Sequence, residues 1–215
     1  MLAPLPERLR PKTLAEFVGQ QHLIGQGKVL RKLVESGNIP SMIFWGPPGV
    51  GKTTLAYILA SALDKEFYAL SAISSSVKDV REIIERTEKA GLFQSPPVVF
   101  IDEIHRFNKA QQDALLGAVE KGNIILIGAT TENPSFEVIS ALLSRCQVYV
   151  LKSLEKEELL ELIEIASKTD EFLRQKNIFL KESEALLQLS GGDARKLLNI
   201  FELVVNSLNA DKMEI

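Results

Sequence analysis

The chain has 215 residues, of which 46% are hydrophobic, so it can form one or two domains with a substantial core. Its net charge of −3 excludes the strong global basic field that favours nucleic acid, although a local basic patch would still be compatible with DNA. The single cysteine, Cys146, excludes an internal disulfide framework, and no apolar run is long enough to span a bilayer.

The first twelve residues carry charges and contain Pro4, Pro6 and Pro11, which is unlike a signal peptide. We therefore expect an extended N-terminus, no membrane segment and a cytoplasmic protein. Beyond it, strands are predicted at 41–45, 67–70, 98–101, 124–127 and 148–151, and helices at 29–36, 54–63, 77–90 and 109–119. Strands that alternate with helices predict a doubly wound α/β parallel-sheet domain over residues 1–151.

The pattern changes after residue 151, where no further strand is predicted. Helices are expected at 154–167, 170–176, 181–189 and 194–208. Gly191 and Gly192 form a stop signal, and Asp193 is a suitable N-cap for the last helix. The sequence therefore predicts a small all-helical domain over 152–209, followed by a polar tail at 210–215.

The stretch from Gly46 to Thr53 fits the phosphate-binding pattern G-x-x-x-x-G-K-[ST] and lies between a predicted strand and a predicted helix. Glycines let backbone N–H groups wrap phosphate oxygens, Lys52 can reach the β- and γ-phosphates, and the Thr53 hydroxyl can ligate Mg²⁺. The expected nucleotide-binding residues here are Gly46, Pro47, Pro48, Gly49, Val50, Gly51, Lys52, Thr53 and Thr54. This P-loop predicts ATP or ADP and Mg²⁺ as the cofactors.

Polar side chains follow two later apolar strands. Asp102 directly follows the strand predicted at 98–101, where its carboxylate can hold Mg²⁺, and Glu103 can polarise the attacking water as general base. The alternative is two solvated acids. Thr131 follows the strand at 124–127 and is the candidate for positioning the water, with a simple turn cap as its alternative.

Two arginines complete the candidate catalytic set. Arg145 precedes the last strand and could reach a phosphate of a neighbouring subunit in trans, because a guanidinium is planar and always charged. Arg195 begins the last helix and could contact the γ-phosphate of its own subunit. For each arginine the alternative is an ordinary surface ion pair.

Together these motifs resemble the AAA+ ATPases, with Walker A at 46–53, Walker B at 98–103, sensor 1 at Thr131, an arginine finger at Arg145 and sensor 2 at Arg195. The segment 7–20, Ser144-Arg145-Cys146 and residues 192–199 are similar to clamp-loader motifs. That resemblance implies that residues 1–20 cover the adenine. The residues it implies for adenine contact are Leu9, Pro11, Val18 and Gly19. It also implies a P-loop NTPase fold with a helical lid.

The runs His105–Asp113 and Gly128–Phe136 are similar to the replication-associated recombination protein A family, which includes the Werner helicase-interacting protein. The resemblance implies a DNA-dependent ATPase that acts on DNA ends, gaps or stalled forks, is nucleoid-associated, contacts single-strand-binding protein and forms a tetramer. In that family a C-terminal helical region carries tetramerisation. Because no residue follows Ile215, we expect a truncated ATPase-plus-lid chain, monomeric by itself.

Two other functions remain compatible with the sequence. One is a clamp-loader-type assembly subunit that uses ATP as a binding switch, and the other is a Holliday-junction branch-migration motor. Cations near two helix starts could hold DNA phosphates without reading sequence, or could be ordinary solvated charges. They are Lys78, Arg81, Arg106 and Lys109. For His105 a structural or coupling role is favoured over metal binding, because no second ligand lies nearby in sequence.

Overall fold

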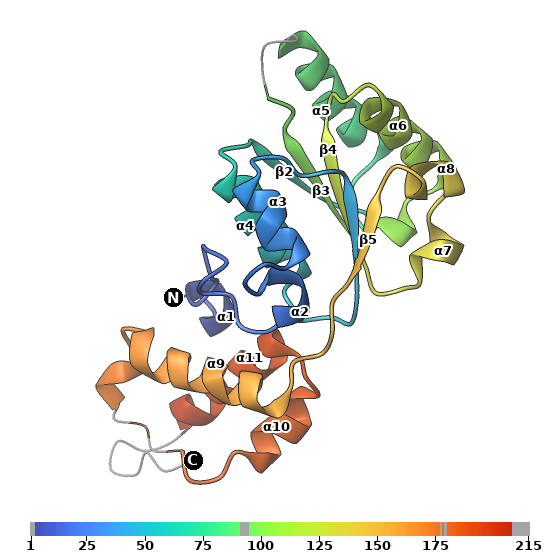
Figure 1. Cartoon of the computed structure of the whole chain (residues 1–215). Coiled ribbons are helices and arrows are strands. Elements are labelled where there is room, and N and C mark those ends of the chain that lie inside the picture. The colour runs from blue at the N-terminus through green and yellow to red at the C-terminus, as the bar shows by residue number, and fades with distance from the viewer. Residues whose placement is uncertain (1–2, 91–94, 177, 179, 208–215) are drawn as a thin grey trace. The chain divides into compact units, whose positions relative to one another are not determined.

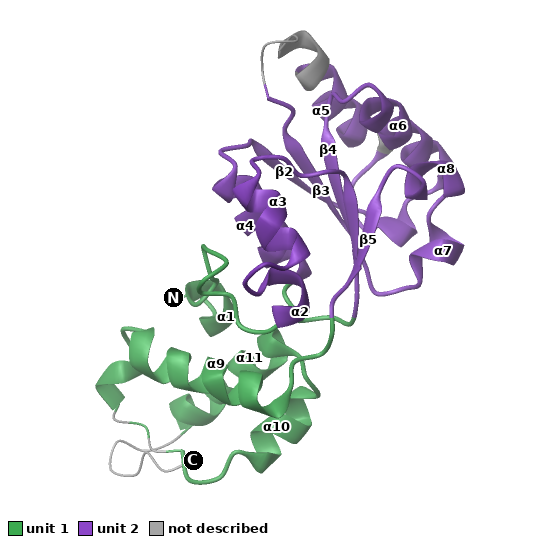
Figure 2. Ribbon diagram, in the orientation of Figure 1, with its two compact units in different colours: residues 1–20, 47–51, 152–215 green, residues 21–46, 52–151 purple. Residues whose placement is uncertain are grey.

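The computed structural model describes residues 3–90, 95–176, 178 and 180–207, which form two compact units. One unit contains residues 21–46 and 52–151, and the other contains 1–20, 47–51 and 152–215 (Figure 2). The tail predicted at 210–215 lies outside the described residues. In the described part of the chain, no helix is both long and apolar enough to cross a membrane.

In the first of these, the sheet unit, the described residues form a parallel sheet with the strand order β2-β3-β4-β1-β5. The strands are β1 (Met42–Trp45), β2 (Phe67–Ser71), β3 (Val98–Asp102), β4 (Ile125–Thr130) and β5 (Gln147–Val150). β1 lies between the two latest strands, since Ile43 is in register with both Gly128 and Val148. This arrangement confirms the predicted α/β class.

Helices cover both faces of this sheet. The helices α3 (Val29–Glu35) and α4 (Lys52–Ala62) lie on one side, and α5 (Val77–Ala90), α6 (Lys109–Glu120) and α8 (Ser140–Leu143) on the other (Figure 1). Alternate strand residues enter different layers, because successive side chains of a strand point to opposite faces. The layer under α5, α6 and α8 includes Ile43, Val99, Ile101, Leu126, Val80, Leu115 and Leu142. Asn108 and Gln111 fix the start of α6 with a reciprocal capping box.

The second, the helical unit, packs α9 (Lys156–Thr169), α10 (Glu184–Ser190) and α11 (Ala194–Ser207) together with α1 (Leu5–Arg8). Its core includes Leu5, Leu154, Leu159, Ile163, Leu197, Phe201 and Val205. Asp193 caps α11, because its Oδ1 accepts a hydrogen bond from the backbone N–H of Lys196 at 2.9 Å.

A largely buried ion cluster joins α1 to α11 and to Asp170 at the end of α9. The guanidinium of Arg8 lies 2.7 Å from Asp170 Oδ2 and 2.7 Å from Glu202 Oε1. The backbone N–H of Leu5 donates to the second oxygen of Glu202 at 2.9 Å. The hydrogen bond from Arg8 holds the pKa of the Asp170 carboxyl below its ordinary value, and the same contact raises the pKa of Arg8.

Two sequence predictions about helices are wrong. The N-terminus is not extended throughout, because Leu5–Arg8 is helical. Pro6 lies in the first helical turn, where its missing N–H has no partner to lose. The helix predicted at 170–176 is reduced to the 3₁₀ turn η2 (Arg174–Lys176). The Asp170 side chain accepts from the backbone N–H groups of Phe172 and Leu173, as a helix cap does, but only turns follow it up to Arg174.

Four short elements have no counterpart in the sequence-based prediction. They are α2 (Gln21–Ile24), η1 (Ile104–Arg106), α7 (Pro134–Glu137) and α8. Each spans one turn, which is too short for a helical periodicity to show. The Asn133-Pro134 pair does carry a signal, because Asn133 caps α7 by accepting from the N–H of Ser135 at 3.0 Å.

Candidate functional site

The P-loop runs along the chain through both units: Gly46 and Lys52 belong to the sheet unit and residues 47–51 to the helical unit. Within the helical unit, Gly49 and Gly51 have φ values of +71° and +93°. A Cβ at Gly49 would lie 1.8 Å from Asp193 Oδ1, and one at Gly51 would lie 2.5 Å from Phe17 Cζ. Both the backbone angles and the space therefore require glycine.

Lys52, in the sheet unit, is the first residue of α4 and is only 7% exposed. Its Nζ donates a hydrogen bond to the carbonyl oxygen of Gly46 at 2.6 Å. The ammonium group is thus folded toward the backbone of the P-loop, on an oxygen acceptor of the kind that a phosphate offers. Thr53 and Thr54 follow in the first turn of α4, and both are half-buried.

The carboxyl ends of β3 and β4 bring the predicted acids and hydroxyl together. Asp102 is the last residue of β3, and Glu103 follows it with a φ of +54°, in the left-handed region. Thr131 directly follows β4, and its Oγ1 donates to Glu103 Oε2 at 3.3 Å. Because β3 and β4 are neighbours in the sheet, two residues that are 28 positions apart meet at one edge.

Two further residues join this group. His105 in η1 places Nδ1 3.2 Å from Glu103 Oε2 and 3.0 Å from Thr130 Oγ1. Thr130 is fully buried, and its hydroxyl exchanges hydrogen bonds with the backbone carbonyl and N–H of Glu132. Sequence reasoning missed Thr130, although the Thr-Thr pair after an apolar strand is a visible signal.

Arg145 lies between α8 and β5, in the sheet unit. Its Nη2 is 2.6 Å from Glu120 Oε1, and its Nη1 donates to the carbonyl oxygen of Ala141 at 2.8 Å. The two charged side chains are 41% and 43% exposed, so this pair is solvated and stabilises the chain little. Among the described residues Arg145 thus forms a solvated ion pair with Glu120, and its role in trans stays a prediction.

The remaining predicted residues lie in the helical unit. Arg195 is the second residue of α11 and is exposed, directly after the Asp193 cap and the N–H of Ala194 that donates to the carbonyl of Gly49. Leu9 packs against the core of this unit, and a Cβ at Gly19 would lie 2.3 Å from Leu154 Cδ2. Pro11 and Val18 are half-buried.

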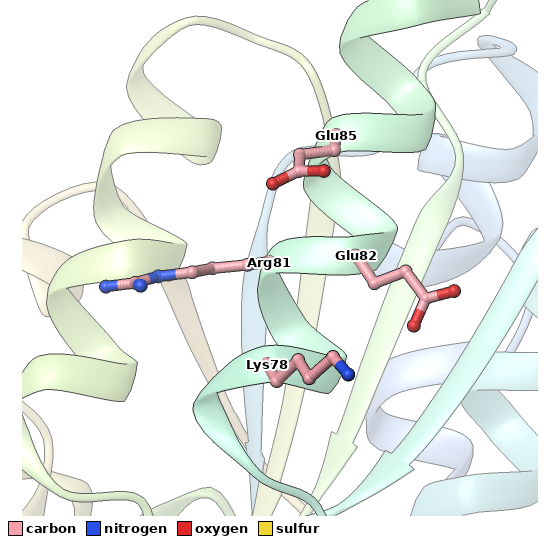
Figure 3. A pocket seen from close by; sticks show the side chains of 4 residues that line it. All are labelled: Lys78, Arg81, Glu82 and Glu85. Carbon is pink, nitrogen blue, oxygen red and sulfur yellow. The ribbon is translucent and has the colours of Figure 1, made fainter.

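Of the four candidate DNA-contacting cations, Arg106 and Lys109 are exposed, and Lys78 and Arg81 have acidic neighbours. Lys78 and Arg81 on α5 line a pocket of about 430 Å³ together with Glu82 and Glu85 (Figure 3). Two cations and two carboxylates leave this pocket with no net charge. In Figure 3 the Arg81 side chain extends toward α6, and Glu82 points the other way. The predicted role of these cations is therefore weakened by their own neighbours.

Comparison with known proteins gives consistent matches. Residues 42–154 match the family described as "ATPase family associated with various cellular activities (AAA)". "Replication-associated recombination protein A" of Haemophilus influenzae is 48% identical over 98% of this chain and 48% of its own length. "ATPase WRNIP1" of Dictyostelium discoideum is 45% identical over 95% of this chain and 24% of its own length.

A solved structure agrees with these matches. The Thermotoga maritima RuvB Holliday junction branch migration motor superposes with a TM-score of 0.72 at 30% identity, over 94% of this chain and 70% of that one. The family match and the relatives confirm the resemblance to the AAA+ ATPases and to the replication-associated recombination protein A family. The chain spans about half the length of the curated bacterial relative above.

Proposed function

This chain belongs to the ATPase family associated with various cellular activities (AAA), and we propose from that premise that it binds ATP and hydrolyses it to ADP and phosphate with Mg²⁺. One observation carries the proposal furthest: Thr131 and His105 both contact the Glu103 carboxylate where β3 and β4 end. Such a carboxylate, held by donors at a strand end, is suited to orient and polarise an attacking water.

The residues at the P-loop fit the phosphate chain and the metal. Left-handed glycines at 49 and 51 free the backbone N–H groups to face an anion. Lys52 already satisfies one oxygen acceptor, Gly46 O, and would exchange it for phosphate oxygens. The Thr53 hydroxyl and the Asp102 carboxylate are hard oxygen ligands of the kind that Mg²⁺ prefers, and the metal would neutralise phosphate charge.

The remaining candidates have separate roles. In this proposal Glu103 is the general base and Thr131 positions the water. Arg145 acts in trans in an assembled form, after it exchanges Glu120 for phosphate, and Arg195 acts from the lid. The adenine would lie against Leu9, Pro11, Val18 and Gly19. The domains of the proposal are an ATPase domain at 1–151 with its adenine segment at 1–20, a lid at 152–209 and a tail at 210–215.

The relatives' names indicate the process in which the ATPase acts. We propose that the whole protein is a DNA-dependent ATPase of replication-fork maintenance and recombination, working on DNA ends, gaps or stalled forks. It would contact single-strand-binding protein, form a tetramer and reside at the nucleoid. The RuvB likeness supports a branch-migration motor as the second candidate, but the identity is 30% there against 48% for the recombination protein.

The test begins with hydrolysis by the purified chain. Lys52→Ala should abolish ATP binding, and Glu103→Gln should retain binding but lower kcat by about a hundredfold or more. Hydrolysis by Lys52→Ala at the rate of the unaltered chain would refute the proposal. If Arg145 acts in trans, the hydrolysis rate per chain should also rise with protein concentration. Arg145→Ala should remove that rise.

The DNA part needs its own assay, in the full-length protein. ATP hydrolysis should be stimulated by duplex ends or gapped duplex more than by closed circular duplex. If only four-way junctions stimulate ATP hydrolysis, the result would favour the branch-migration candidate. Strong binding to a sliding clamp in a pull-down would favour a clamp-loader-type subunit, and indifference to every DNA would contradict the DNA dependence.

A further inference from the structure

His105 lies between the carboxylate and the hydroxyl that end two neighbouring strands. It belongs to η1, directly after Glu103 and Ile104, and its side chain is only 12% exposed. Its Nδ1 is 3.2 Å from Glu103 Oε2 and 3.0 Å from Thr130 Oγ1. A single ring nitrogen is therefore within hydrogen-bond reach of one group on each strand end.

The hydrogen bonds of Thr130 decide which partner supplies the proton. Its one hydroxyl proton is donated to the backbone carbonyl of Glu132 at 3.1 Å. Toward His105 the hydroxyl oxygen can then only accept, as can the carboxylate of Glu103. Because both neighbours accept, Nδ1 of His105 must carry the proton, which is the less common arrangement for a neutral imidazole.

We propose that His105 is a positioning residue for Glu103, and that its Nδ1–H donates a bifurcated hydrogen bond to Glu103 and Thr130. This inference rests on the proposed role of Glu103 as general base. Glu103 Oε2 is held from two directions, by Nδ1–H of His105 and by the hydroxyl of Thr131. A movement of either strand end would change the distances from Nδ1–H to these two acceptors.

The backbone of Glu103 explains why its carboxylate is held by side chains from other elements. Its φ of +54° lies in the left-handed region, which a residue with a Cβ rarely adopts. The carboxylate therefore belongs to the turn that follows β3 and not to the strand itself. Donors from η1 and from the end of β4 hold it, and a general base is effective only when held within reach of its proton.

The first test reads the proton directly in the whole chain. The chain has two histidines, so ¹⁵N-histidine labelling gives two ring systems, and His22→Gln assigns them. At about pH 8, where an ordinary imidazole is neutral, Nδ1 of His105 should be protonated. Glu103→Gln should shift that signal, because its partner changes. A bare Nδ1 with the proton on Nε2 would overturn the proposal, whatever the ATPase activity.

The second test separates positioning from stability. His105→Ala should lower kcat by about tenfold with KM within about twofold, since the carboxylate is kept and only its direction is lost. His105→Asn should restore most of kcat, because its side-chain amide N–H lies near the place of Nδ1–H. Equal losses in both variants, or a change confined to KM, would overturn the proposal. If Glu103→Gln keeps full activity, the general-base assignment fails and the histidine spectrum still decides the contact.

Discussion

Replacing Arg8 by alanine should destabilise the helical unit far more than the same change two positions later. Arg8 lies 2.7 Å from two carboxylates, and its side chain and that of Asp170 are 15% and 4% exposed. Arg10 also lies 2.7 Å from a carboxylate, that of Glu7, but those two side chains are 39% and 55% exposed. The two arginines differ in burial rather than in contact distance, so Arg10→Ala is a matched control.

The expected magnitude follows from what each carboxylate retains. Breaking a buried ion pair costs ~3–5 kcal/mol, because the remaining charge stays buried without compensation. Asp170 keeps two backbone donors, from Phe172 and Leu173, and Glu202 keeps one. We therefore expect a loss of about 3 kcal/mol for Arg8→Ala, the lower end of that range. Arg10→Ala removes an exposed pair and should cost less than about 1 kcal/mol.

The assay must report on the helical unit. The single tryptophan, Trp45, belongs to β1 in the sheet unit, so its fluorescence would follow the wrong part of the chain. Hydrogen exchange of peptides from α9 and α11 under increasing urea reads the free energy of opening directly. Equal, small losses in Arg8→Ala and Arg10→Ala would refute the argument that burial decides the effect.

The pH dependence gives the experiment a second reading. Arg8 holds the pKa of Asp170 below its ordinary value of 3.8 in the folded chain. Stabilisation from a carboxyl whose folded-state pKa is lowered is complete above the unfolded value and is lost as pH falls through the folded-state value. The difference in stability between the unaltered chain and Arg8→Ala should stay constant from about pH 5 to pH 8 and shrink in stronger acid.

Three further outcomes follow from the structure. Gly49→Ala should weaken ATP binding, because its Cβ would lie 1.8 Å from Asp193 Oδ1 and must displace that side chain. Gly27→Ala, with a similar φ of +70° and open space, should cost only about 1 kcal/mol of strain and keep binding. Equal nucleotide affinity in both variants, read by titration with a fluorescent ATP analogue, would contradict this. Gly128→Ala should lower sheet stability by about 1–3 kcal/mol in urea unfolding followed by Trp45, since a Cβ there would lie 2.6 Å from Ile43 Cδ1. Burial raises the pKa of the Cys146 thiol to about 12, so its reaction with a disulfide reagent at about pH 8 should be slow in the folded chain and rapid in urea; a rapid reaction in both would contradict the burial.

Much of the sheet unit was predictable because its signals are local. Continuous apolar runs mark the strands, and the P-loop residues are adjacent in sequence. The meeting of Glu103 and Thr131 also follows from the sequence, because the carboxyl ends of parallel strands share one edge. The partners of His105 were not predictable, since they depend on the left-handed turn at Glu103 that sequence periodicity does not reveal.

In the helical unit the local signals were less reliable. The prolines predict an extended N-terminus, yet the first turn of a helix tolerates proline, and Pro6 lies in the first turn of α1. Asp170 caps the N–H groups of Phe172 and Leu173 and also binds Arg8, yet the segment of helical composition that follows it forms only turns and η2. Arg8 finds its partners more than 160 positions away, and no local pattern carries a pairing of that range.

The place of β1 in the sheet has a consequence for how the chain folds during synthesis. Met42 pairs with Ile127 on one side and with Gln147 on the other, so the strand that leads into the P-loop receives both its neighbours late. Such long-range pairings slow folding, because a large loop must close before any contact forms. As the ribosome extends the chain, the apolar segment Met42–Trp45 waits without a sheet partner until most of the unit has emerged. A chain stopped just before β5 would leave one edge of this strand open to pairing with another molecule.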